Sequence, residues 1–511
     1  MMRIPFGNLP STSTLFLDYI ADWNRVRNFY PRDYSLESII AFSRERPRLE
    51  SAHRRRLCDA LAEQQKAWGG TAAPVEPLFE GAVVVITGQQ PGLFSGPLYT
   101  ILKAITIIKL AHTLEENGVH AVPVFWIASE DHDHLEIEST TIIDRDSQLQ
   151  HLEVDFSNAE SAPVGWLRLR DEVAGTIAKC LTALPESEFQ SSVKKVLEES
   201  YQSGLSPVDA FGRMMVKLFD GTGLVLVDPL HPELKKLAEP ALKNAVRQNA
   251  DIRSAVLSRS RALSQAGYHE QVKVDANFTG LFGYRGKSRV SLRPEELSTD
   301  SMLSPNALLR PAVQDSIFPT VAFIAGPAEQ AYMAQAAAAY ETLRIPVPPV
   351  VPRISATVLE ARVTRILRKY DMSFADVLRG RDFLKRKAVE SLQGVEVFDA
   401  VRDRITGELE SLRGTVRAVD PTLEGAIDTS RQKVLHQIEG LRTKFINAEA
   451  RRNETLDRHL DAMANSLFPE KKLQERVVNV TSFLVRYGSS FIAKLQEELT
   501  LDSKEHQVVE I

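Results

Sequence analysis

An unbroken run of titratable side chains comes directly after a short apolar segment. The segment 122–128 has the pattern of a buried strand, and it leads through Ser129 into the run 130–134, Glu-Asp-His-Asp-His. Ligands of open α/β sheets bind just outside the carboxyl ends of the strands. Carboxylates beside imidazoles can perform general acid–base chemistry or hold an amine and ribose hydroxyls. The candidate catalytic residues are therefore Glu130, Asp131, His132 and Asp133.

The same run permits two other interpretations. A solvated acidic turn needs no function at all. A metal site is also conceivable, but His132 and His134 are two residues apart and share a face only on a strand. We assign no metal ligand, and whether a metal takes part stays open.

A glycine-rich turn follows the strand pattern Val83–Ile86 and precedes a helix start at Ser95-Gly96-Pro97. It is neither a Walker motif nor the dinucleotide fingerprint, because the lysine and the glycine spacing that these require are missing. A strand-to-helix turn can still hold phosphate against free backbone N–H groups. Its glycines could equally serve only close packing. The candidate nucleotide-binding residues here are Thr87, Gly88, Gln89, Gln90, Gly92 and Gly96.

Two further strand ends carry polar residues. Gly326, Glu329 and Tyr332 follow an apolar strand at the start of a helix, where Glu329 could reach a cleft or simply complement the helix dipole. Arg353 and Ser355 follow the last strand pattern. We expect them on a mobile loop, where they could stabilise negative charge that develops on a phosphate. A serine that caps a following helix would explain the same residues.

These residues need a parallel sheet to bring them together. The run 83–86, a long apolar helix from about Leu98 and the run 122–128 predict a β-α-β unit. Further buried-strand patterns lie at 223–227, 319–325 and 347–351. The sequence therefore predicts an α/β fold with a parallel sheet.

We expect three parts along the chain. Residues 1–80 form an N-terminal helical arm, in which an apolar face packs inward. Residues 81–357 form the α/β core, with inserts at about 150–220 and 270–310. Residues 358–511 form a helical coiled-coil region whose C-terminal helices pack back on the core. The arm's apolar face contains Tyr19, Ile20, Trp23, Val26 and Phe29.

The C-terminal part carries an apolar heptad pattern that is broken at Asp420-Pro421. This favours an antiparallel coiled-coil hairpin, with an ordinary helical bundle as the alternative. An exposed heptad stripe most simply serves a homodimer. The stripe residues are Phe398, Ile405, Leu412 and Val419 before the break, and Ile427, Val434, Ile438, Leu441, Phe445 and Ala448 after it.

Composition narrows the class of protein. With 62 Lys and Arg against 67 Asp and Glu in 511 residues, the net charge of -5 gives no reason to expect nucleic acid or membrane partners. The 2 cysteines point to a reducing compartment. No apolar leader follows Met1, and no apolar run is long enough to span a bilayer. We expect a soluble, cytoplasmic protein.

Taken together, the motifs resemble the cysteine ligases of bacillithiol biosynthesis. The matching runs are TGQQPGLFSGPLYT at 87–100, PVFWIASEDHD at 123–133, Leu309-Arg310-Pro311, Gly326-Pro327, Pro352-Arg353 and Leu473-Gln474-Glu475-Arg476. The resemblance covers essentially the whole chain. It implies a Rossmann-like core related to class I aminoacyl-tRNA synthetases, connecting inserts and a C-terminal coiled-coil domain that forms a dimer.

The resemblance also implies a reaction, the addition of cysteine to the amine of glucosaminyl-malate. Because amide formation from a free carboxylate is uphill in water, ATP is the expected activating cofactor, with ATP or ADP held by the glycine-rich turn, Arg353 and Ser355. Substrate would contact Trp126, Gly326, Glu329 and Tyr332. The His-x-Gly-His signature of the synthetases is replaced by the run 89–92, Gln-Gln-Pro-Gly. The alternative is a catalytically altered nucleotide-binding scaffold that uses its coiled coil for protein interactions.

Overall fold

A computed structural model describes residues 2–10, 12–157, 159, 161–390, 396–452, 454–501 and 504–511. The chain forms two compact units. The core unit comprises Met1–Arg145, Leu149–Val358 and Gln474–Val509, and the helical unit comprises Asp146–Gln148, Leu359–Leu473 and Glu510–Ile511. Each is described separately below.

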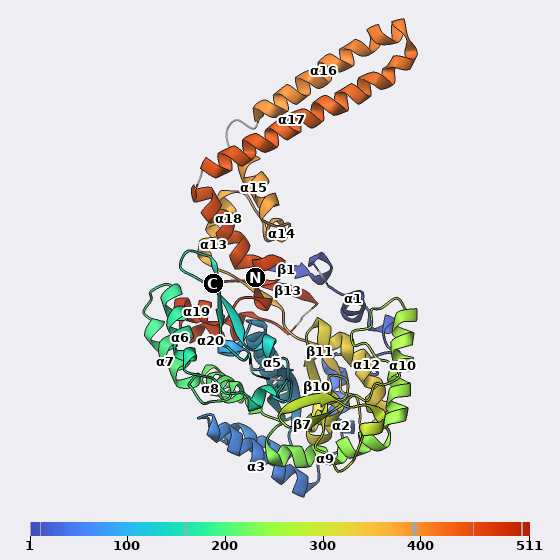
Figure 1. Ribbon diagram of the computed structural model, residues 1–511, viewed down its shortest axis with the longest axis vertical. Helices are drawn as coiled ribbons and strands as arrows, with labels where there is room; N and C mark the ends of the chain where they lie inside the picture. The colour runs from blue at the N-terminus through green and yellow to red at the C-terminus, as the bar shows by residue number, and fades with distance from the viewer. Residues whose placement is uncertain are drawn as a thin grey trace. The chain divides into compact units, whose positions relative to one another are not determined.

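A five-stranded parallel sheet forms the centre of the core unit, as predicted (Figure 1). Its strand order is β11-β10-β2-β3-β6, so the chain builds outward from β2 in both directions. Such a reversal of strand order leaves a crevice at the carboxyl ends of the two central strands, here β2 and β10. The strands are β2 (Val83–Gln89), β3 (Ala121–Ile127), β6 (Val225–Val227), β10 (Thr320–Ala325) and β11 (Val350–Pro352).

Helix α5 (Tyr99–Glu116) connects β2 to β3. Its apolar residues are buried on all sides, and Gly118 ends the connection with a φ of 78°, a value that suits glycine. The helix begins at Tyr99, next to the predicted start at about Leu98. Of the predicted start signal Ser95-Gly96-Pro97, Ser95 belongs to a short 3-10 turn (Leu93–Ser95), and Gly96 and Pro97 come before the helix. Phe94 and Ser95 both have positive φ there.

The other helices of the core unit cover the sheet and line its edges. Helix α12 follows β10 and lies against α10, as Figure 1 shows. Near the C-terminus, α20 packs on α5. The helices are α1 (Thr14–Ala21), α2 (Leu36–Glu45), α3 (Ser51–Ala67), α4 (Glu76–Glu80), α6 (Glu172–Ala183), α7 (Gln190–Ser200), α8 (Pro207–Leu218), α9 (Pro232–Arg247), α10 (Asn249–Gln265), α11 (Arg310–Ile317), α12 (Pro327–Leu343), α19 (Thr481–Tyr487) and α20 (Ser490–Glu498).

Three small sheets complete the core unit. β1 (Met2–Pro5) pairs antiparallel with β13 (Glu505–Glu510), beside β12 (Ala356–Leu359). The N-terminal segment thus opens with a strand rather than a helix. β4 (Ser139–Ile143) and β5 (Leu149–Glu153) form a hairpin. β7 (Leu281–Arg285) pairs antiparallel with both β8 (Ser288–Ser291) and β9 (Ser304–Pro305).

The helical unit contains a long hairpin of two antiparallel helices, α16 (Glu396–Val419) and α17 (Glu424–Arg452), as Figure 1 shows. The turn between them holds Pro421. The remaining helices are α13 (Ala361–Lys369), α14 (Phe374–Leu378), α15 (Arg381–Glu390) and α18 (Glu454–Leu467). Across the described residues of both units, no helix combines the length and apolar character that crossing a bilayer requires.

The predicted heptad stripe divides between two surfaces of this hairpin. The rings of Phe398 and Phe445 meet with centroids 5.4 Å apart, and Ile427 is buried. Leu412, Val419 and Leu441 are 49%, 80% and 60% exposed. One part of the stripe therefore closes the hairpin, and the other part faces away from it.

Candidate functional site

A cleft of about 560 Å³ lies at the carboxyl edge of the sheet, where β2, β3 and β10 end. Seven of the predicted site residues, from the ends of β2 and β3, line it, and four more come from β10–α12 and β11. The lining candidates are Gly88, Gln89, Gln90, Trp126, Glu130, Asp131, His132, Gly326, Glu329, Tyr332 and Arg353. Tertiary structure thus brings together residues that lie far apart in sequence.

The acidic side of the cleft follows β3. Glu130 is 8% exposed and forms an ion pair with Lys235, whose Nζ lies 2.6 Å from Oε1. Asp131 Oδ2 accepts a hydrogen bond of 2.8 Å from Gln90 Nε2. Asp131 Oδ1 accepts from the backbone N–H of His132 at 2.7 Å. These bonds hold two carboxylates in fixed orientations at the cleft.

His132 contacts a cation that comes from the second insert. Arg289 Nη1 lies 3.0 Å from His132 Nδ1, and Asp131 Oδ1 lies farther away at 3.6 Å. Desolvation lowers the pKa of His132, and the Arg289 guanidinium lowers it further, against the opposing effect of Asp131 and Asp133. The imidazole is therefore favoured in its neutral form.

Of two further carboxylates in this segment, Asp133 and Glu136, only Glu136 lines the cleft. Asp133 is exposed and lies outside the cleft lining. Glu136, which was not among the predicted site residues, lines the cleft. Partial desolvation raises the pKa of Glu136, and the carboxylates of Asp133 and Asp131 add to this effect. Glu136 is thus a carboxylate that takes up a proton more readily than an ordinary glutamate.

A buried lysine links two strand ends beneath the cleft. Lys103 on α5 is 3% exposed, and its Nζ lies 2.7 Å from Gly88 O, 2.9 Å from Gln89 Oε1 and 2.7 Å from Glu329 Oε2. Burial lowers the pKa of Lys103, against the opposing effect of Glu329. Glu329 also accepts from the Gly326 N–H at the start of α12. Its carboxylate therefore combines the helix-capping role with an ion pair at the cleft.

Arg310 adds a second cation on this side. Its Nη2 donates to the Tyr332 hydroxyl at 3.0 Å and its Nη1 to Gln314 Oε1 at 2.9 Å. A Cβ on Gly88 would make a tight contact of 3.3 Å with Trp126 O and an ordinary contact of 3.7 Å with Arg310 Nη1. The cationic side can thus receive carboxylate or phosphate oxygens.

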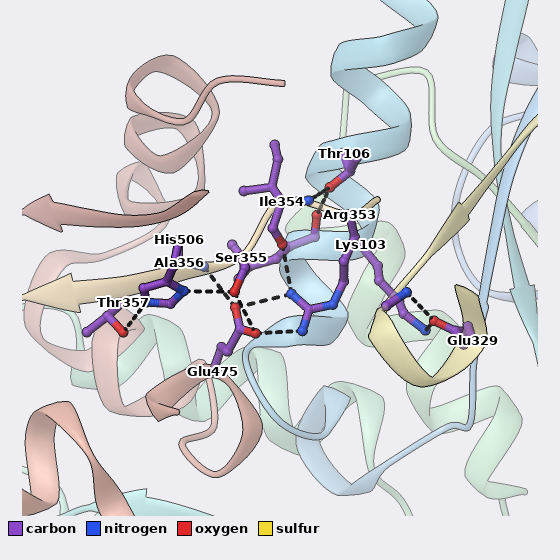
Figure 2. Close-up of polar contacts among 12 residues, drawn as sticks. Lys103, Thr106, Glu329, Arg353, Ile354, Ser355, Ala356, Thr357, Glu475 and His506 are labelled. Atoms are coloured by element: carbon purple, nitrogen blue, oxygen red, sulfur yellow. Dashed lines mark hydrogen bonds and ion pairs between the residues drawn. The ribbon is translucent and has the colours of Figure 1, made fainter. Parts of the chain in front are cut away.

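Arg353 is buried and held by a carboxylate from the C-terminal part of the core unit. Its guanidinium makes two bonds to Glu475, from Nη2 to Oε1 at 2.6 Å and from Nη1 to Oε2 at 3.1 Å (Figure 2). Arg353 still lines the cleft. It is 5% exposed, so the expectation of a mobile loop was wrong.

Ser355 does not reach the cleft. Its hydroxyl contacts Glu475 Oε1 at 3.0 Å and His506 Nδ1 at 2.8 Å, and Thr357 contacts the other ring nitrogen of His506 at 2.8 Å (Figure 2). Burial lowers the pKa of His506 to about 4. The structure gives Ser355 a place in this buried cluster instead of a contact with the cleft.

The glycine-rich turn after β2 is closed by internal hydrogen bonds. The backbone N–H groups of Gly92, Leu93 and Ser95 donate to Gln90 O, Ile137 O and the Tyr201 hydroxyl. The carbonyls of Phe94 and Gly96 accept from Asn479 Nδ2 at 2.9 and 2.8 Å. The prediction that these N–H groups are free to hold phosphate was therefore wrong.

Packing explains the glycines of this turn. A Cβ on Gly92 would lie 2.8 Å from Gly96 Cα, closer than real contacts allow. Thr87 is buried and donates to Ile324 O at 3.0 Å. Thr87, Gly92 and Gly96 therefore lie outside the cleft lining, whereas Gly88, Gln89 and Gln90 belong to it.

The cleft contains several residues that were not selected from the sequence. Lys103 could have been identified from the sequence, because it is a charged residue within an otherwise apolar helix. Arg310 lay in a motif but was given no role. Arg476 likewise lay in a motif without a role, and Arg289 had no local sequence pattern that pointed to it, since only the fold of the insert brings it to the cleft.

A second, larger cavity of about 940 Å³ lies at the opposite edge of the sheet. It is lined by the start of β3 and by loops around Gly81 and Gly223, and none of the predicted site residues lines it. Within the described ranges, no group of three or more His, Cys, Asp or Glu side chains is arranged to hold a metal ion.

Two family models together match nearly the whole chain. Residues 2–354 match the family model described as bacillithiol biosynthesis BshC, N-terminal Rossmann-like domain. Residues 356–511 match the model described as bacillithiol biosynthesis BshC, C-terminal coiled-coil domain. These matches confirm the predicted fold class, a Rossmann-like core followed by a C-terminal coiled-coil domain.

Individual relatives agree. A protein from Koribacter versatilis (strain Ellin345) is 34% identical over 99% of this chain and 99% of its own length. One from Solibacter usitatus (strain Ellin6076) is 34% identical over 98% of each. Both are named "Putative cysteine ligase BshC".

A crystal structure titled "putative arginyl t-RNA synthetase from Campylobacter jejuni" aligns over 87% of this chain and 98% of its own, at 11% identity and a TM-score of 0.24. That score supports no argument, so the relation to class I synthetases stays an expectation. The two family models and the full-length relatives show that this chain belongs to the BshC family of bacillithiol biosynthesis.

Proposed function

We propose that this protein is a cytoplasmic ligase that joins the carboxyl group of cysteine to the amine of glucosaminyl-malate, the last step of bacillithiol biosynthesis, with ATP as the activating co-substrate. The observation that carries the proposal is that carboxylates after β3, Asp131 and Glu136, line the same cleft as the guanidinium groups of Arg310 and Arg353. A ligase must hold an amine and an activated, anionic carboxyl derivative side by side. Such a cleft suits both.

The cationic side would receive the negative oxygens. Arg310 and Arg353 are both fixed by partners, Tyr332 and Glu475, so their guanidinium groups need little reorganisation when charge develops. The attacking amine must be neutral, and it must lose a proton during the reaction. Asp131 and Glu136 line the acidic side and are the residues placed to take that proton.

Isotope transfer tests both the reaction and the activation step. The full-length protein is incubated with ATP, glucosaminyl-malate and cysteine labelled with ¹⁸O in its carboxyl group, and products are read by mass spectrometry. We expect the amide product, with one ¹⁸O in AMP if an acyl-adenylate forms or in phosphate if an acyl-phosphate forms. Nucleotide binding without any amide product would favour the scaffold alternative.

We also propose that the protein is a homodimer through the α16–α17 hairpin. The support is the exposed part of the apolar stripe, Leu412, Val419 and Leu441, because exposed apolar stripes on paired helices favour association. Leu441→Glu should convert a dimer to a monomer in sedimentation experiments while helix content is retained. Lys433→Glu, at an exposed polar position of the same helix, is the matched control.

A further inference from the structure

Among the residues that the second insert brings to the cleft, Arg289 of β8 is held from several directions. Arg289 is 7% exposed. Its Nε donates to Ser304 Oγ at 2.8 Å and its Nη2 to Pro305 O at 2.8 Å. Its guanidinium carbon lies 3.7 Å from the centre of the Phe282 ring. The remaining nitrogen, Nη1, lies 3.0 Å from His132 Nδ1 and 3.8 Å from Asp131 Oδ1.

This contact determines where the imidazole carries its proton. A guanidinium has only donors, so a nitrogen at hydrogen-bond distance from it must present a lone pair. Nδ1 of His132 is therefore unprotonated, and a neutral ring then carries its proton on Nε2. An imidazolium would direct its Nδ1–H at the N–H of Arg289, with two positive charges facing each other.

The surroundings of His132 agree with this assignment. The charged groups that face it are Asp131 and Asp133 from its own segment and Arg289 from β8, while Phe282 of β7 contributes an aromatic ring 5.6 Å away. Asp131 Oδ1 is 3.6 Å from Nδ1, beyond a good hydrogen bond, and it accepts instead from the backbone N–H of His132, while Oδ2 accepts from Gln90. Burial and Arg289 together lower the pKa of the ring.

We propose that Arg289 is a positioning residue that holds His132 as its Nε2–H tautomer, so that His132 donates a hydrogen bond to an oxygen of the reacting carboxyl or phosphoryl group and is not the general base. The assignment of the tautomer stands on geometry alone. The role as donor rests on the proposed function.

The tautomer can be measured without turnover. Full-length protein labelled with ¹⁵N-histidine is studied by solid-state NMR, with the His132 signals assigned by their loss in His132→Gln. We expect an unprotonated Nδ1 and a protonated Nε2, retained to a pH below the ordinary histidine pKa. Arg289→Met should raise the His132 pKa. Arg285→Met should not, because this exposed residue of the same hairpin pairs with Glu296. A protonated Nδ1 in the unmodified protein would overturn the assignment.

The donor role has a separate kinetic test. A glutamine side chain can donate from about the position of Nε2 but cannot act as a base at neutral pH. His132→Gln should therefore keep kcat within about tenfold of the original, whereas His132→Ala should lose roughly 100-fold or more, as for removal of one preorganised donor. Equal losses in both variants, or no loss in either, would overturn the role. If the unmodified protein forms no amide, the proposed function fails while the NMR result still decides the tautomer.

Discussion

The segments that follow β2 and β3 begin side by side at the same edge of one sheet, yet only the segment after β3 is open to the cleft. After β3, Glu130, Asp131 and His132 present polar atoms to the cleft. After β2, only the first residues reach it, and the turn around Gly92 is sealed by Tyr201 and Asn479. A glycine-rich strand end therefore does not identify a phosphate site unless its N–H groups are unpaired.

Of the substitutions that test this difference, one after β3 should have the largest effect on activity. Asp131→Asn keeps the side-chain volume and removes a carboxylate that lines the cleft. We expect kcat/KM for amide formation to fall by roughly 10²- to 10⁴-fold, the range for loss of a general acid–base group, with little change in melting temperature. Near-normal turnover by the mass-spectrometric assay would remove Asp131 from the site.

The segment after β11 extends the comparison, because it too is closed, here around His506. The folded-state pKa of about 4 lies below the ordinary 6.5. The unfolded chain therefore binds a proton more readily, and this contribution to stability is complete above pH 6.5 and is lost as the pH falls toward 4. The full loss is on the order of 3 kcal/mol.

Denaturant unfolding at pH 7, 5.5 and 4.5 measures this dependence. His506→Gln keeps a donor and an acceptor for the Ser355 and Thr357 hydroxyls, so the variant should lose less stability than the original between pH 6.5 and 4. Parallel pH curves for the two proteins would show that another group titrates in that window.

A smaller effect is expected in the closed turn after β2. Gly92→Val places a Cβ against Gly96 Cα and should destabilise the protein by about 1–3 kcal/mol, as overpacking does. Gly175→Val on α6, where a Cβ meets nothing within 4 Å, controls for the β-branched side chain. If Gly92→Val instead weakens ATP binding by calorimetry without lowering the melting temperature, the turn binds nucleotide after all.

The smallest effect should come from Asp133. It belongs to the same acidic run as Asp131 but is exposed and outside the cleft lining. Asp133→Asn should change kcat/KM by only a few fold, through the loss of a nearby charge in a screened environment. A loss as large as that of Asp131→Asn in the same assay would show that the run acts as one unit.

Local sequence determined the elements of the fold. β-branched apolar runs such as Val83–Ile86, and a helix pattern that ends at Asn117-Gly118, predict a parallel α/β sheet because their burial and end signals are properties of neighbouring residues. The same reasoning located Glu130, Asp131 and His132, since a parallel strand that ends in charged residues must present them at one edge of the sheet.

Only the tertiary structure decided which of the candidates share the cleft and what state they are in. Whether the N–H groups after β2 are free depends on Tyr201 and Asn479, which lie more than one hundred residues away. The bonds from Arg353 to Glu475 and from Arg289 to His132 likewise join distant segments. Hydrogen-bond partners, burial and tautomer are set by these non-local contacts, which no local pattern of residues encodes.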